Sequence, residues 1–280
     1  MKNFLIITNS KKDKNNKITK RIVDHLTGGG AVCHVIDHYE KYWEKPVDVP
    51  EDTQCILVIG GDGTILAAAR ALVGTGIPLL GINRGTLGFL ADVKLTELDH
   101  ALDRLLRDDY RIENRIMLSA EVYKNGTLTD RYIALNDISV NKANRLRTIG
   151  LKVMINDAIF DQYHADGVLV CTPTGSTGYN LSAGGPIINP TCKNFVITPV
   201  CPHSLTARSV VLAKDDTVTI EVVQIRQGKT EEGMVSYDGR DGTRVHPGDK
   251  VVIYRADAVT PFIKIDEVSF VEILKEKMLR

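Results

Sequence analysis

The sequence lacks the features that mark several large classes of protein. Lys and Arg total 35 and Asp and Glu total 35 among the 280 residues, so no net charge attracts nucleic acid or a membrane surface. The five cysteines are an odd number without CxxC spacing, which favours free thiols in a reducing compartment over disulfides or a zinc site. We find no signal peptide and no apolar run long enough to span a bilayer. We therefore expect a cytoplasmic protein of one large or two medium domains, without a nucleic-acid or membrane partner.

Two familiar phosphate-binding motifs are also absent. The loop Gly60-Gly61-Asp62-Gly63-Thr64 is not followed by Gly-Lys-Ser/Thr, so it is not a P-loop. A dinucleotide-binding fingerprint that used Gly61 and Gly63 would need a third glycine where Leu66 stands. The loop must therefore be interpreted from its own residues.

This glycine-rich loop joins an expected strand to an expected helix. The apolar run Cys55 to Ile59 predicts a buried strand, and Ile65 to Leu72 predicts a helix. Glycines let a ligand approach the backbone closely, and a helix N-terminus favours phosphate and an ionised carboxylate such as Asp62. The members of this candidate phosphate loop are Gly60, Gly61 and Thr64. A tight turn with Asp62 as the helix N-cap remains an equal alternative at this point.

The N-terminal part of the chain alternates apolar strands with amphipathic helices. Besides residues 55–59, strands are expected at 3–8, 31–36 and 77–82, and helices at 16–26 and 96–106. This alternation predicts a parallel sheet with helices on its faces. The second glycine-rich loop, Asn83 to Leu90, also follows a strand, so both loops should border one crevice. Thr96 and Asp99 resemble a capping box at the last of these helices.

The pattern changes near Arg111. Short alternating segments follow, with Asn125-Gly126 and Asn156-Asp157 as hairpin turns. Residues 267–280 return to helical spacing and can pack back on the first domain. We therefore expect an α/β domain at residues 1–110 with 260–280, and a largely antiparallel β domain at residues 111–259.

Two further stretches in the β domain carry ligand-binding chemistry. Asn136-Asp137 places an amide beside a carboxylate, which suits ribose hydroxyls and an adenine edge, although a simple turn explains the pair as well. Asp166 to Pro186 runs from a strand into a loop crowded with hydroxyls and glycines, then into a short helix. Small hydroxyl residues there can bind phosphate or ribose, and Tyr179 offers a stacking face.

In this order and spacing, GGDGT, LGFL, ND, DGVLVCTPTGSTGYNLSAGGPI and PHSLTAR resemble the NAD kinase family. GGDGT alone also resembles loops of lipid kinases and phosphofructokinases, whereas the long fourth stretch is highly specific. The resemblance implies a Rossmann-like N-terminal domain that carries GGDGT and a C-terminal β-sandwich domain that binds NAD. It also implies a homodimer or homotetramer that transfers the terminal phosphoryl group of ATP to the 2′-hydroxyl of the adenosine ribose of NAD, giving NADP.

The same resemblance implies roles for individual residues. Asp62 is the catalytic proton acceptor, and Asp166 reaches across a subunit interface. The residues implied in NAD binding are Gly63, Phe89, Asn136, Asp137, Arg147, His164, Asp166, Thr174, Thr177, Gly178, Tyr179, Asn180, Leu181, Ser182 and Arg240. Three of them depart from the commonest family pattern, which has Ala at Gly178, Arg at His164 and Gln at Arg240.

No metal-binding cluster is evident from the spacing of His and carboxylate residues, so Mg²⁺ or another divalent cation should arrive bound to ATP. Two other hypotheses remain: a lipid or sugar kinase, and a sensor that binds a dinucleotide without catalysis. The first would lack TPTGSTGY, and the second has no use for the Asp62 carboxylate beside phosphates. The sequence leaves open whether polyphosphate can replace ATP and whether NADH is accepted.

Overall fold

The computed structural model describes residues 1–8, 13–36, 47–83, 88–144, 147–225, 231–266 and 269–278. The chain divides into two compact units. The N-terminal unit comprises Met1–Arg115 with Val259–Arg280, and the β unit comprises Ile116–Ala258. The strands β6 (Arg111–Lys124) and β17 (Lys250–Lys264) contribute residues to both units.

A parallel sheet forms the centre of the N-terminal unit, in the strand order β2-β1-β3-β4. The bounds are Asn3–Thr8 for β1, Val32–Ile36 for β2, Cys55–Ile59 for β3 and Leu79–Asn83 for β4. The short β5 (Val93–Lys94) and Phe262 of β17 also pair with β4 in parallel. The four predicted strands are confirmed, with small differences at their ends.

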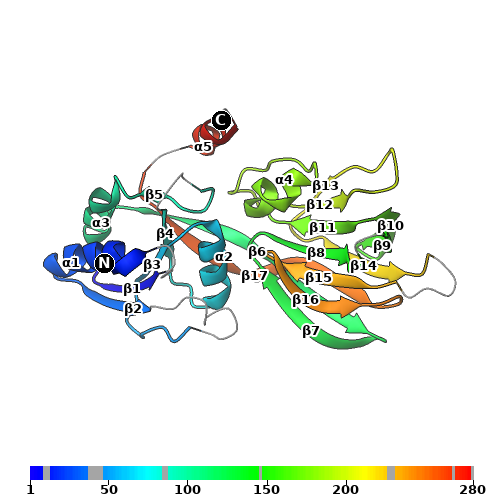
Figure 1. The fold of residues 1–280 in the computed structure, drawn as a ribbon, viewed down its shortest axis with the longest axis horizontal. Helices are drawn as coiled ribbons and strands as arrows, with labels where there is room; N and C mark the ends of the chain where they lie inside the picture. The colour runs from blue at the N-terminus through cyan, green and yellow to red at the C-terminus, as the bar shows by residue number, and fades with distance from the viewer. Residues whose placement is uncertain are drawn as a thin grey trace. The chain divides into compact units, whose positions relative to one another are not determined.

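Helices cover both faces of this sheet (Figure 1). These helices are α1 (Lys17–Gly28), α2 (Asp62–Ala71) and α3 (Leu98–Leu106). A 3-10 turn at Lys14–Asn16 precedes α1, and a further helix, α5 (Phe270–Met278), follows β17. α1 and α3 lie side by side on one face, and α2 lies on the other (Figure 1). Alternate strand residues such as Phe4 and Leu57 are buried in one cluster with Leu26 of α1 and Leu102 of α3.

The predicted capping box at Thr96 and Asp99 is wrong. α3 begins at Leu98, its N-cap is Glu97, and no side-chain capping bond forms. The Asp99 carboxylate instead accepts hydrogen bonds from the Arg21 guanidinium, at 3.0 Å from Nε and 2.8 Å from Nη2. The carboxylate that local spacing assigned to the cap is therefore used by a cation on α1.

The β unit contains two packed groups of strands. One is an antiparallel sheet in the order β13-β12-β11-β8-β15-β16. Its bounds are Asp137–Lys142 for β8, Gly167–Cys171 for β11, Phe195–Val200 for β12, Val210–Leu212 for β13, Gly233–Tyr237 for β15 and Arg240–Val245 for β16. In the other group β10, β9, β14 and β17 are neighbours in that order, β17 pairs with β6, and β6 with β7. The remaining bounds are Thr127–Ala134 for β7, Ile149–Ile155 for β9, Ala158–Ala165 for β10 and Thr217–Val223 for β14.

Alternate residues of both groups share one buried core, as in a β-sandwich. Val140 of β8 and Val170 of β11 lie in the same cluster as Val153 of β9 and Ile220 of β14. Both predicted hairpins are present, joining β6 to β7 and β9 to β10. Their turn residues have positive φ, at 49° and 78° in Asn125-Gly126, which is the geometry that favours Asn and Gly. The fold is thus an α/β domain with a β-sandwich domain.

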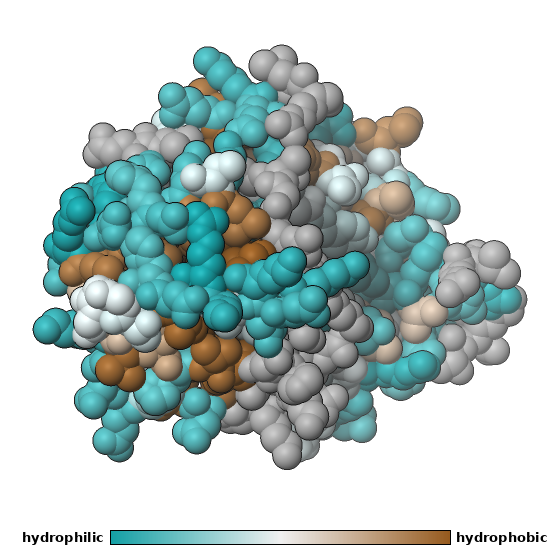
Figure 2. Space-filling view, turned by 60° about the vertical axis from the view of Figure 1, so that its left-hand side comes forward, coloured by the Kyte–Doolittle hydropathy of each residue, from teal (hydrophilic) through white to brown (hydrophobic). Residues whose placement is uncertain are grey.

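Among the residues coloured in Figure 2, hydrophilic side chains cover most of the visible face, and hydrophobic side chains gather in smaller areas between them. In the described parts of the chain, no helix is both long and apolar enough to cross a membrane.

Candidate active site

The sheet of the N-terminal unit has a topological switch point between β1 and β3. From β1 the chain passes to β2 on one side, and β3 then pairs with the other side of β1. Ligands of open α/β sheets bind at the carboxyl ends of strands at such a point. Here these ends are Thr8 and Ile59, which are opposite each other in register. The GGDGT loop begins at the next residue, Gly60, so it lies where a ligand is expected.

The fold requires glycine at one position of this loop, Gly60, but not at another, Gly63. A Cβ on Gly60 would lie 2.3 Å from the Thr64 Oγ1, so the packing of Thr64 against the loop requires glycine there. A Cβ on Gly63 would meet no atom within 4 Å. Gly63 is exposed in the first turn of α2, and the described fold does not require glycine at this position. A ligand that approaches the backbone would require it.

Asp62 does not cap its own helix. The N-cap of α2 is Gly61, and no side-chain capping bond is formed. The Asp62 carboxylate instead accepts backbone hydrogen bonds from the second glycine-rich loop, at 3.2 Å from Phe89 N to Oδ2 and 3.3 Å from Leu90 N to Oδ1. The N-cap alternative is therefore contradicted. The carboxylate joins two loops at the carboxyl edge of the sheet.

Gly88 makes this arrangement possible. A Cβ at this position would lie 2.0 Å from the Asp62 Oδ1. The half-buried Phe89 follows directly and supplies one of the two N–H groups. Residues 84–87 of the same predicted loop lie outside the described residues, as do 267–268 and 279–280 of the C-terminal stretch.

In the β unit, Asn136 and Asp137 lie at the start of β8. The backbone N–H groups of Leu135, Asn136 and Asp137 point to the Asp238 carboxylate, the shortest distance being 2.6 Å from Asn136 N. The Asn136 Oδ1 is buried and has no hydrogen-bond partner in the described structure. Asp137 is only 7% exposed. An acceptor without a partner and a buried carboxyl group beside each other are available for donors of a ligand.

Burial raises the pKa of Asp137 to about 7, and the negative charge of Asp238 contributes in the same direction. The native state therefore binds a proton between pH 4 and pH 7 that the unfolded chain releases. We expect this group to lower stability by up to roughly 1.4 kcal/mol for each pH unit as the pH rises through that window.

The variant Asp137→Asn has no carboxyl group at this position and therefore does not bind or release this proton. We expect the variant to be more stable than the wild type at pH 8 in urea unfolding, with a difference that shrinks toward pH 5. Parallel stability curves across this range would show that Asp137 does not titrate near neutrality.

The loop after β11 divides into buried and exposed residues. Thr172 donates to Leu135 O at 2.6 Å, and Ser176 donates to Pro173 O at 2.6 Å. Asn180 is fully buried; it donates to Pro186 O at 2.9 Å and accepts from Thr198 Oγ1 at 2.7 Å. Much of the hydroxyl and amide content that suggested ligand binding therefore holds the loop together.

Most of the other predicted members of this loop lie near or at the surface. They lie in a 3-10 turn at Thr174–Thr177, at Gly178, and in a one-turn helix α4 at Tyr179–Ser182. Tyr179 and Leu181 are each 42% exposed, Gly178 and Ser182 are exposed, Thr177 is half-buried, and Thr174 is buried. Gly175 packs this loop against Asn136, because a Cβ there would lie 2.2 Å from Asn136 O. The start of the loop thus packs directly beside the Asn136-Asp137 pair.

Four predicted residues lie elsewhere in the β unit. The Asp166 carboxylate accepts a hydrogen bond from Lys142 Nζ at 2.5 Å. His164 on β10 is exposed, and so is Arg147 ahead of β9. The Arg240 guanidinium lies 5.8 Å from the centre of the Tyr237 ring.

Sequence reasoning missed two charged residues of this region, Asp238 and Lys142. The signal for Asp238 was an Asp-Gly turn, since Asp238 and Gly239 have φ of 46° and 74° at the β15–β16 hairpin. Lys142 offers no such local signal, because its partner Asp166 is distant in sequence.

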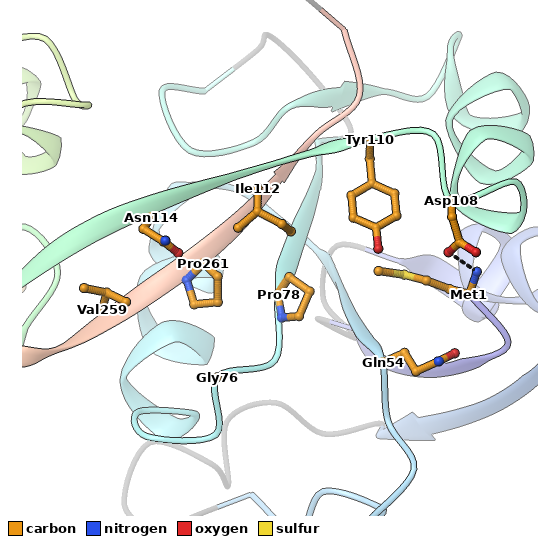
Figure 3. Close-up of a pocket in the computed structure, with 10 residues that line it drawn as sticks. All are labelled: Met1, Gln54, Gly76, Pro78, Asp108, Tyr110, Ile112, Asn114, Val259 and Pro261. Atoms are coloured by element: carbon orange, nitrogen blue, oxygen red, sulfur yellow. Dashed lines mark hydrogen bonds and ion pairs between the residues drawn. The ribbon is translucent and has the colours of Figure 1, made fainter.

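A cavity of about 520 Å³ lies at the opposite edge of the N-terminal sheet (Figure 3). It is lined by Met1, Gln54 and Pro78, among others. Gln54 and Pro78 directly precede β3 and β4, and Met1 lies just before β1. The Tyr110 hydroxyl points toward the Met1 side chain, and the N-terminal ammonium group of Met1 donates to Asp108 (Figure 3). This cavity is thus at the amino ends of the strands and is separate from the glycine-rich loops.

In the residues that the structure describes, no group of three His, Cys, Asp or Glu side chains is placed to hold a metal ion.

Comparison with known proteins matches both parts of this chain to one family. The family model of the ATP-NAD kinase N-terminal domain matches residues 4–110, and that of the ATP-NAD kinase C-terminal domain matches residues 135–265. The NAD kinase of Agathobacter rectalis is 42% identical over 282 residues, covering 99% of each chain. The NAD kinase of Lachnoclostridium phytofermentans is 39% identical over 281 residues, again covering 99% of each.

Solved structures support the fold. A yeast NADH kinase complexed with NADH has a TM-score of 0.85 at 23% identity, covering 99% of this chain and 87% of that one. An NAD kinase from Archaeoglobus fulgidus in complex with ATP has a TM-score of 0.76 at 23% identity, covering 95% and 94%. On the family models and the full-length relatives, this chain belongs to the NAD kinase family.

Proposed function

We propose that Asp62 is the general base of this NAD kinase. The enzyme transfers the terminal phosphoryl group of ATP to the 2′-hydroxyl of the adenosine ribose of NAD, and NADP is formed. Phosphoryl transfer needs positioned groups and charge neutralisation more than covalent help from the protein. A ribose hydroxyl is a poor nucleophile, and a positioned carboxylate that accepts its proton contributes about 10²–10⁴-fold.

The observation that carries this proposal is the position of the Asp62 carboxylate. Asp62 is the first residue of α2, close after the switch-point strand β3, and its carboxylate is held by two backbone N–H groups of the second glycine-rich loop. Each oxygen accepts one of these bonds, and a carboxylate oxygen can accept more than one. The group is thus fixed in direction and keeps acceptor capacity for a hydroxyl proton.

The β unit supplies most of the NAD-binding residues in this proposal. The half-exposed ring of Tyr179 stacks on a base, and the Asn136 Oδ1 and the Asp137 carboxyl receive adenine and ribose donors. The other proposed contacts of this unit come from Arg147, His164, Asp166, Thr174, Thr177, Gly178, Leu181, Ser182 and Arg240. Gly63 and Phe89 of the N-terminal unit are proposed NAD contacts as well. Asn180 we assign to the support of this loop, because its amide is buried and bonded within the protein.

ATP is the phosphoryl donor, and Mg²⁺ or another divalent cation accompanies it in this proposal. A divalent ion prefers phosphate oxygens and water to an all-protein site in such enzymes. We also propose a cytoplasmic homodimer or homotetramer in which Asp166 contacts a dinucleotide bound mainly by another subunit.

The experiment for the overall function is incubation of the purified protein with ATP and NAD, with Mg²⁺ or with excess EDTA. NADP is measured with an NADP-specific dehydrogenase. NADP formed only with Mg²⁺ supports the proposal, and undiminished formation in EDTA would contradict the role of the cation. Sedimentation under assay conditions tests assembly, because a fully active monomer is incompatible with the shared role of Asp166.

The variant Gly63→Ala distinguishes a role of Gly63 in ligand binding from a role in the stability of the fold. Alanine fits the open space at this helical position, so we expect thermal stability to be equal or higher by about 0.5–1 kcal/mol. Gly63 is a proposed NAD contact, so a methyl group there should instead raise the KM for NAD by about 10-fold or more, since overpacking costs about 1–3 kcal/mol. Gly28→Ala, which also enters open space, is the matched control. An unchanged KM in Gly63→Ala would show that no ligand approaches this backbone.

A further inference from the structure

The C-terminal helix α5 begins beyond residue 265, where the match to the family model ends. Two of its side chains contact the segment that holds Asp62. Lys277 Nζ lies 5.6 Å from the centre of the Phe89 ring, and Glu276 Oε2 lies 3.9 Å from Lys94 Nζ. The helix therefore contacts both ends of the segment between Phe89 and β5.

We propose that Lys277 is a positioning residue for the Asp62 base, acting through Phe89. A Lys ammonium within about 6 Å of a ring centre is attracted by the ring. Phe89 is thus held by its side chain on one side, while its backbone N–H donates to the Asp62 carboxylate on the other. Restricting the ring restricts the backbone that carries this N–H.

The local sequence makes such a restraint useful. Gly88 precedes Phe89 directly, and glycine gives a loop more conformational freedom than any other residue. The hydrogen bonds from Phe89 N and Leu90 N to Asp62 are 3.2 and 3.3 Å, at and just beyond the long end of the usual range of donor–acceptor distances. A contact from outside the loop therefore stabilises a geometry that the loop alone holds weakly.

The ion pair of Glu276 with Lys94 has a secondary role. Both side chains are 38% exposed, and such pairs contribute little on their own. It orients α5 relative to β5, and Lys277 makes the contact that matters for the base. This inference depends on the proposed role of Asp62.

The test compares Lys277→Ala, Lys277→Arg and the control Lys275→Ala, whose side chain is exposed on the same helix. We expect Lys277→Ala to lower kcat by about 2- to 5-fold, the equivalent of one exposed cation–π contact, with both KM values nearly unchanged. Arginine also binds aromatic rings, so Lys277→Arg should restore the rate. Lys275→Ala should match the wild type.

A double-mutant cycle shows whether Lys277 acts through Asp62. In an Asp62→Asn background, Lys277→Ala should cause no further loss of kcat. An additive loss, or a raised KM for MgATP with normal kcat, would overturn the positioning role; the second result would assign Lys277 to phosphate binding. A slow Asp62→Asn with a normal Lys277→Ala would also overturn it and leave the base in place. A fully active Asp62→Asn would remove the base, and with it the inference.

Discussion

Asp62→Asn is expected to lower kcat by about 100-fold or more, because the variant cannot accept the proton of the ribose hydroxyl. The structure also predicts a small cost in stability. Both partners of the side chain, Phe89 N and Leu90 N, are donors, and the amide NH₂ of Asn cannot accept from one of them. We expect this lost bond to cost about 1 kcal/mol. The affinity for NAD, measured by calorimetry, should stay near the wild-type value.

Stability and rate must be separated in this variant. A thermal melt measures the loss of the backbone bond, and steady-state kinetics at saturating ATP and NAD measure the loss of the base. A variant that unfolds a few degrees earlier but keeps nearly the wild-type kcat would show that Asp62 only joins the two loops.

Gly88→Ala should be the second most damaging change for catalysis. The new Cβ would lie 2.0 Å from the Asp62 Oδ1, where real contacts are at least 3.0 Å. The carboxylate must therefore move by about 1 Å, and a displacement of that size at a reacting group can cost about 100-fold in rate. We expect the loss in kcat, measured as NADP formed at saturating substrates, with little change in the KM for NAD.

The matched control is Gly28→Ala, at the end of α1, where an added Cβ meets no atom within 4 Å. It should retain the wild-type kcat. If Gly88→Ala acts through Asp62, it should add little to Asp62→Asn, because the base has already been removed. Wild-type turnover in Gly88→Ala would contradict the geometry described for this carboxylate.

Local signals were sufficient for much of the fold. The strand from Cys55 to Ile59 and the following helix could be predicted because hydrophobic runs and glycines are adjacent in sequence. The Asn125-Gly126 hairpin could be predicted for the same reason, since the turn itself requires positive φ. The capping box at Thr96 failed because a distant cation, Arg21, competes for the Asp99 carboxylate.

The site was less predictable because its key contacts join distant segments. That Asp62 follows a strand is visible in sequence, but its bonds to Phe89 and Leu90 depend on the packing of two loops. Asn180 stands in a polar loop, yet the one-turn helix directs its amide inward to Thr198. The contact of Lys277 with Phe89 likewise joins two distant parts of the chain and has no local pattern.

The most direct measurement of the central claim is the single-turnover rate of phosphoryl transfer to NAD. Enzyme in excess over radiolabelled ATP is mixed with saturating Mg²⁺ and NAD, quenched at short times and analysed for labelled NADP. If Asp62 is the base, the chemical step in Asp62→Asn is slower than in the wild type by the same factor as kcat, about 100-fold or more. Equal single-turnover rates in the two proteins would contradict it and would place Asp62 outside the chemical step.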